Sequence, residues 1–160
     1  MSSIISMEEM AQIIREQYAA GGEKVSFTPR GVSMLPMLRD NLDKVVLEKP
    51  KDRLKKYDLP LFQRDNGSFI LHRVVGVEED GTYDMCGDNQ INIEKGIRHD
   101  QIIGVVTSFE RMGKWYQCTD ISYRIYVRIR VASIPCRKLK ARGIRYSKRV
   151  VNKLKRMIKR

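Results

Sequence analysis

The chain has 160 residues and a formal net charge of +12, which is long enough for one domain with a hydrophobic core but short for two. No window holds the roughly 18 consecutive apolar residues that a membrane span requires, and the acidic N-terminal segment is unlike a secretory signal peptide, so we expect a cytoplasmic chain. The three cysteines are far apart, with no CxxC pair and two histidines to help, so we expect no disulfide framework, no metal site and no cofactor.

The first expected element is a helix from Met7 to about Tyr18. Its apolar residues recur at helical spacing on one face, with acids early and an arginine late, as the helix dipole prefers. Gly21 and Gly22 then supply a flexible stop. Residues 1–23 are therefore predicted to form an N-terminal helical segment.

Residues 24–117 consist of short runs rich in β-forming residues, among them KVSFTP, DKVVLEK, LPLFQR, SFILHRVVGVEE, TYDMCGD and IIGVVTSFER. Turn signals separate these runs at short intervals, and RDNGS and EEDGT are hairpin candidates. This pattern predicts a mainly β domain with a coiled antiparallel sheet. Ser33 then falls in a loop after one strand, and His72 within or at the end of another.

Residues 118–160 form a basic C-terminal extension. Residues 121–160 hold 15 of the 31 Lys and Arg residues and none of the 19 Asp and Glu residues, so the excess positive charge lies entirely in this segment. The stretch ISYRIYVRIRVASI alternates like a strand but leads into a sequence typical of a basic amphipathic helix. We expect a helix over most of residues 137–160, broken at Gly143.

Two single residues have the chemistry of a hydrolytic site, although neither is specific alone. A serine hydroxyl such as that of Ser33 needs a base within hydrogen-bond reach and donors for a developing oxyanion before it can act as a nucleophile. The ordinary histidine pKa, about 6.5, suits His72 to such base work. A serine before a proline is more often a turn residue, however, and a lone histidine in a strand is more often a packing residue.

Four stretches in order make the pattern specific. GVSMLPML at 31–38, FILHRVVGV at 69–77 and DMCGDNQINIEK at 84–95, followed by IIGVV at 102–106, resemble the successive conserved boxes of the signal peptidase I family. The resemblance implies the coiled β-sheet fold that this family shares with the self-cleaving phage and SOS repressors. It also implies a serine endopeptidase that removes a leader or signal segment from a peptide or protein precursor.

The resemblance assigns roles to individual residues. Ser33 matches the nucleophile, and His72 matches the general base of the archaeal and endoplasmic-reticulum branch, where most bacterial members have lysine. An imidazole base benefits from a carboxylate that fixes its tautomer. We rank Glu94 first for that role, Asp88 second and Asp100 third, with a structural role for Asp88 in the GDN turn and a loop role for all three left open.

Three further residues are expected to support the loop of the nucleophile. Gly31 stands where some relatives have a serine that assists the oxyanion hole, which leaves backbone N–H groups, that of Ser33 included, as donors. Gly31 also permits close approach of a substrate backbone. Met34 is expected to pack under the site, and Pro36 to shape the loop.

The sequence departs from the family by lacking an N-terminal membrane span. The chain is therefore expected to act on a leader peptide in the cytoplasm, to lie peripherally on a membrane, or to be a catalytically silent peptide- or nucleic-acid-binding protein. Residues 121–160 suit an anionic membrane surface better than nucleic acid because apolar residues are interspersed with the cations. Cleavage of a soluble peptide is expected to survive their deletion.

A repressor-like self-cleaving regulator is less favoured, because its lysine base is absent and about 25 residues before the Ser33 region are too few for a helix-turn-helix domain.

Overall fold

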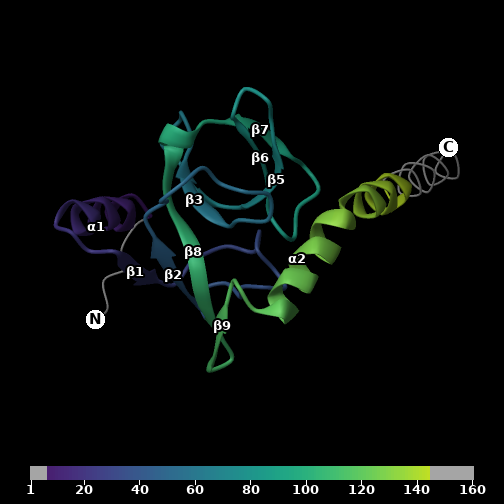
Figure 1. The fold of residues 1–160 in the computed structure, drawn as a ribbon. Helices are drawn as coiled ribbons and strands as arrows, with labels where there is room; N and C mark the ends of the chain where they lie inside the picture. The colour runs from purple at the N-terminus through teal and green to yellow at the C-terminus, as the bar shows by residue number, and fades with distance from the viewer. Residues whose placement is uncertain (1–6, 145–160) are drawn as a thin grey trace, which may run out of the picture.

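A computed structural model describes residues 7–144, and the first six and last sixteen residues lie outside this description (Figure 1). In chain order the described elements are α1 (Met7–Ala19), β1 (Lys24–Phe27), β2 (Lys44–Glu48), β3 (Pro60–Gln63), β4 (Phe69–Leu71), β5 (Arg73–Val77), β6 (Tyr83–Cys86), β7 (Glu94–Ile97), the 3-10 helix η1 (His99–Gln101), β8 (Ile102–Arg111), β9 (Lys114–Gln117) and α2 (Ile121–Ala132). The predicted mainly β fold with antiparallel strands and a short N-terminal helix is confirmed.

Strand β8 lies at the centre of the larger of two sheets and pairs with β2, β3 and β9. The strand order is β1-β2-β8-β3-β4, with β9 also paired to β8, and every pairing is antiparallel. Register shifts in both β2–β8 and β3–β8 bend this strand, as β-bulges do, so that it serves two halves of a curved sheet. The smaller sheet has the order β5-β6-β7.

The two hairpins predicted from turn chemistry are confirmed. The sequence RDNGS connects β3 to β4, and the Arg64 N–H donates to the Ser68 carbonyl oxygen at 2.9 Å. The sequence EEDGT connects β5 to β6, closed by a bond from the Glu78 N–H to the Thr82 carbonyl oxygen at 2.9 Å. Between these hairpins the chain passes from the larger sheet to the smaller one at His72, which places this residue at the junction of the sheets.

Two apolar clusters hold the elements together. The larger one packs α1 and the β1–β2 loop on the larger sheet; Ile14 of α1 is fully buried in it, whereas Ile13, also expected on the apolar face, is 42% exposed. The smaller cluster lies around Phe62 and Tyr83, under the smaller sheet. The helical prediction for the N-terminal segment is thus confirmed over the described part of α1.

The strand-like alternation after residue 120 is misleading, because this segment is helix α2. Tyr123 and Val127, four residues apart, are buried as one helical stripe, and this spacing outweighs the period of two. After a turn at Ser133 the chain is helical again over 134–144, so the break expected at Gly143 is wrong. The predicted helix beyond residue 144 lies outside the described residues. No helix within 7–144 is long and apolar enough to cross a membrane.

Candidate active site

Ser33 lies in the loop between β1 and β2, on a packed turn. Met34 is 4% exposed and belongs to the main core, and Pro36 follows a cis peptide bond in the same turn. The carboxylate of Asp40 accepts the N–H of Gly31 at 2.7 Å, and the φ of Gly31, 99°, is one that a side chain would strain. The loop-supporting residues expected from the sequence therefore lie around Ser33 and hold its backbone.

The predicted nucleophile and the predicted base both lie beside Gly87. A Cβ added to this glycine would lie 3.1 Å from both the Cβ of Ser33 and the Nε2 of His72, and 2.7 Å from the Ser33 carbonyl oxygen. The Asn89 N–H donates to that carbonyl at 2.7 Å, and the Asn89 side-chain amide donates to the Val32 carbonyl at 3.2 Å. The turn that carries Gly87 thus brings together two residues that are far apart in the sequence.

His72 is 4% exposed, and burial has a strong effect on its charge. Burial lowers the pKa of its imidazole to about 4; the nearby Arg64 also lowers it, whereas Glu94 and Asp88 act to raise it. At neutral pH the ring is uncharged and can accept a proton. Its Nδ1 is buried and makes no hydrogen bond within the part of the chain that the structure describes.

The acid ranked first from sequence does not contact His72. Both oxygens of Glu94, at the start of β7, accept hydrogen bonds from Arg64 at 2.6 Å. Asp100 is 72% exposed and pairs with Arg98 at 3.2 Å. Neither acid forms the hydrogen bond to His72 that was expected, and each pairs with an arginine instead.

Asp88 is committed to a buried ion pair. Its two carboxylate oxygens each accept a bond of 2.8 Å from the guanidinium of Arg73, whose side chain is completely buried. The Tyr126 hydroxyl donates to the same carboxylate at 3.0 Å. Asp88 therefore fits the structural role left open for it, and it too makes no hydrogen bond with His72.

Helix α2 and the helical segment after it also hold this turn. Arg130 donates to the Asp88 carbonyl oxygen at 2.7 Å, and Arg137 donates to the same oxygen at 2.7 Å and to the Gln90 carbonyl at 2.9 Å. Sequence reasoning missed these contacts. The signal was the spacing of Tyr126, Arg130 and Arg137 on one helical face, which the strand-like alternation obscured.

A small cavity opens beside Ser33. One side is lined by residues of the β1–β2 loop, namely Pro29, Arg30, Gly31, Ser33, Met34, Leu38 and Arg39, and the other side by β4. Its volume, about 80 Å³, is smaller than the roughly 150 Å³ of a cavity that admits benzene, so it suits a small side chain. Strand β4 ends the strand order of the larger sheet, which leaves it an edge to which an extended peptide can add.

The backbone of Ser33 has a free donor. Its N–H, like those of Val32 and Met34 on either side, donates to no group within residues 7–144, whereas the N–H groups of Gly31 and Leu35 are bonded. An N–H in this position can receive the negative charge that develops on a carbonyl oxygen during attack by the hydroxyl. The sequence predicts this N–H as an oxyanion donor, and in the structure it is unbonded within the described residues.

No group of three or more His, Cys, Asp and Glu residues among the described residues is arranged to hold a metal ion, and the three cysteines are free thiols. No protein-family model matches the chain, and no curated protein matches it. A functional conclusion therefore depends on the order of the motifs and on the geometry around Gly87.

Proposed function

We propose that this chain is a serine endopeptidase of signal peptidase I type, which cleaves a leader or signal segment from a peptide or protein precursor. Ser33 is the nucleophile and His72 is the general base. The observation that carries the proposal is the convergence of the Ser33 Cβ and the His72 Nε2 on the Cβ position that Gly87 leaves empty.

The chemistry follows from the positions of these groups. A precursor segment adds to the edge of β4 and places a small side chain in the cavity beside Ser33. The Ser33 oxygen bonds to the scissile carbonyl carbon while its proton passes to His72 Nε2, and the Ser33 N–H receives the oxyanion. The C–N bond then breaks, and His72 returns the proton to the leaving amine. Water, deprotonated by His72, then bonds to the acyl carbon, the bond between that carbon and the Ser33 oxygen breaks, and His72 returns the proton to the Ser33 oxygen.

The site supports a Ser–His dyad instead of a triad. His72 Nδ1 lacks a carboxylate partner among the described residues, so Glu94 and Asp88 favour the imidazolium only through space. Disabling the orienting acid of a triad lowers turnover by about 10⁴-fold. We therefore expect slow cleavage.

The proposal extends to location. We infer a cytoplasmic peptidase that meets its precursor at the periphery of a membrane. Residues 121–144 support this, because they contain seven Lys and Arg residues and no Asp or Glu. A surface of that charge is attracted to anionic lipid.

The second candidate is a catalytically silent peptide-binding protein. The observation that favours it is the unpartnered Nδ1 of His72 together with a pKa of about 4, because an imidazole that is hard to protonate is a weak base. In that case the cavity and the edge of β4 bind an extended peptide without cutting it.

One experiment separates the two candidates. The full-length protein is incubated with a library of extended peptides that carry small residues at each possible cleavage point, and the products are identified by mass spectrometry. We expect the wild type to cleave, Ser33→Ala and His72→Ala to bind the same peptides without cleavage, and the matched control Ser26→Ala to behave as wild type. Unchanged melting temperatures show that the fold is intact.

Binding without cleavage by the wild type would replace the peptidase with the silent binding protein. Full activity of Ser33→Ala would refute the assignment of the nucleophile. Specific binding of an oligonucleotide instead of any peptide would contradict both candidates.

A further inference from the structure

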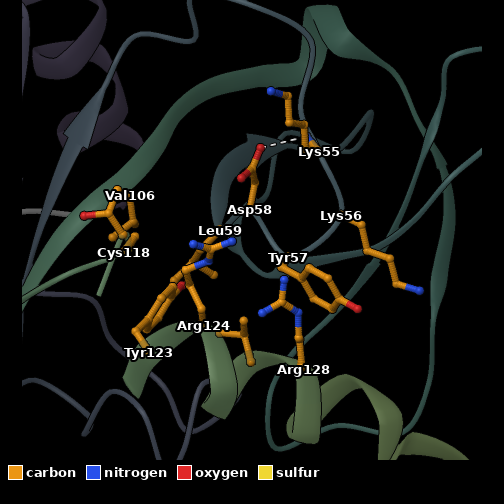
Figure 2. A pocket seen from close by; sticks show the side chains of 12 residues that line it. Lys55, Lys56, Tyr57, Asp58, Leu59, Val106, Cys118, Tyr123, Arg124 and Arg128 are labelled. Carbon is orange, nitrogen blue, oxygen red and sulfur yellow. Dashed lines mark hydrogen bonds between the residues drawn. The ribbon is translucent and has the colours of Figure 1, made fainter. Parts of the chain in front are cut away.

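A second hollow lies between α2 and the segment that leads into β3, and Ser33 does not line it (Figure 2). Its volume is about 320 Å³. Lys55 and Lys56 lie on one side of it, and Arg124 and Arg128 reach towards it from α2. It is therefore large enough for a group of several heavy atoms and is bordered by four cations.

The four basic side chains that border the hollow are not paired with carboxylates of residues 7–144. None of them forms an ion pair within the described residues. The acid that lines the hollow is Asp58, which accepts the Lys55 N–H at 2.7 Å, and burial raises the pKa of its carboxyl. Four cations and one carboxylate therefore leave the hollow with a net positive charge.

Tyr57 lines the hollow in a fixed backbone conformation. Its φ is 85°, a backbone conformation that is strained for a bulky residue and that tends to persist at functional sites. The Tyr57 N–H donates to the Val74 carbonyl at 2.8 Å, which holds it there. The guanidinium of Arg128 and the ammonium of Lys56 lie 5.9 and 5.6 Å from the centre of its ring.

An apolar stripe runs beside the hollow on the outer side of α2. Ile121, Ile125 and Ile129 are 75%, 52% and 64% exposed and follow one another at four-residue spacing. Arg124 and Arg128 line the hollow, and each lies about 100° around the helix from the isoleucine that follows it, so the arginines lie between the stripe and the hollow. The stripe and the hollow thus form one continuous surface, apolar on one side and cationic on the other.

We propose that this surface docks on an anionic membrane, with the isoleucine stripe inserted among the acyl chains and the hollow receiving the phosphate of a lipid headgroup. Cations flanking exposed apolar residues complement a surface that is apolar inside and anionic at its boundary. Nucleic acid offers the phosphates but no apolar layer for the stripe. This inference does not depend on Ser33 being catalytic.

The test uses the full chain and vesicles of phosphatidylcholine with or without phosphatidylglycerol, in a flotation assay at low and high salt. We expect binding only with phosphatidylglycerol. Arg124→Gln with Arg128→Gln should weaken binding about thirtyfold, since each basic residue near an anionic surface contributes about a fivefold factor. Ile125→Ser with Ile129→Ser should remove the part of the binding that resists salt.

Matched controls remove two positive charges or two exposed apolar side chains elsewhere: Lys51→Gln with Lys114→Gln, and Val77→Ser with Met112→Ser. We expect wild-type vesicle binding from both and unchanged melting temperatures from all variants. Equal loss in variants and controls would overturn the proposal, as would equal vesicle binding by wild type and the α2 variants. Two other results would overturn it: oligonucleotide binding that exceeds vesicle binding, or a dimer in solution that the isoleucine variants abolish. Peptide cleavage is measured separately, so failure of docking and failure of the peptidase proposal remain distinguishable.

Discussion

Two arginine–carboxylate pairs lie near His72 and differ mainly in their burial. Arg73 and Asp88 have side chains 0% and 2% exposed, whereas Arg64 and Glu94 have side chains 35% and 27% exposed. The bond lengths are similar, 2.8 Å in the first pair and 2.6 Å in the second. Distance alone therefore does not reveal what an ion pair does.

The surroundings of each pair decide its role. The buried guanidinium of Arg73 also donates to the Tyr57 carbonyl and the Tyr123 hydroxyl, so that pair joins β5, the Asp88 turn and α2. The Arg64–Glu94 pair joins only the end of β3 to β7 and is reached by solvent. The first pair connects three parts of the fold, whereas the second connects two; Glu94, Arg64 and Asp88 all affect the pKa of His72 through space.

The largest expected effect comes from breaking the buried pair. Asp88→Asn leaves the buried charge of Arg73 without its partner, which costs about 3–5 kcal/mol in comparable cases. We expect a loss of that size in the free energy of unfolding, measured with urea, and loss of cleavage. The matched control Glu94→Gln should cost less than about 1 kcal/mol because solvent screens its pair. Similar losses in both variants would contradict the distinction.

His72 should make stability depend on pH. Its pKa is about 4 in the folded protein and near 6.5 when unfolded, so the unfolded chain binds the proton first as the pH falls. The contribution of His72 to the free energy of unfolding is complete above about pH 6.5. It falls by about 3 kcal/mol as the pH is lowered from about 6.5 to 4. His72→Gln should remove this part of the pH dependence, and an unchanged stability curve would show that the imidazole is not buried as described.

The same shift predicts a wide pH range for activity. The acidic limb of kcat/KM reports the base of the free enzyme, so we expect it near pH 4 and not near 6.5. A profile of peptide cleavage by the wild type checks this. A limb at 6 to 7 would mean that the ring is hydrated or oriented by a carboxylate in solution.

Contacts from the helical C-terminal part should matter less than Asp88 but still affect catalysis. Arg130→Gln with Arg137→Gln removes donors to the Asp88 carbonyl, at about 1–3 kcal/mol for each lost charged hydrogen bond. We expect a lower kcat, with KM for a soluble peptide little changed, and wild-type behaviour from the control Arg142→Gln. Deleting residues 121–160 is no longer expected to spare cleavage, because Tyr123 and Val127 are part of the core.

The smallest effect should come from the exposed pair. Glu94 acts to raise the pKa of His72 and Arg64 acts to lower it. Glu94→Gln should therefore move the acidic limb to lower pH, and Arg64→Gln should move it to higher pH, with little change in stability. Shifts of both variants in the same direction would indicate a structural effect on His72 instead of an electrostatic one.

Local chemistry explains which parts could be predicted from the sequence. The hairpins at RDNGS and EEDGT depend on turn residues that act within a few positions, and both are present. The proximity of Ser33 and His72 was predicted from the order of the motifs, and both side chains lie beside Gly87. Their catalytic roles stay proposals.

Two features could not be predicted because they depend on contacts between residues far apart in the sequence: the pairing of Glu94 with an arginine, and the helical conformation of α2. Glu94 is engaged by an arginine 30 positions earlier, and no spacing in the sequence shows that pairing. In residues 121–131 the apolar side chains satisfy a period of two and a four-residue spacing together. Only the packing of Tyr123 and Val127 against the core decides between them.

The absence of a side chain at Gly87 has a genetic consequence. Every missense change at a glycine codon adds at least one carbon, and here that carbon would come within 2.7 Å of a backbone oxygen that cannot rotate away. No amino acid other than glycine fits without displacing the Ser33 loop. In a mutational scan read out by cleavage, position 87 should therefore tolerate no substitution, although it takes no part in any bond that is made or broken.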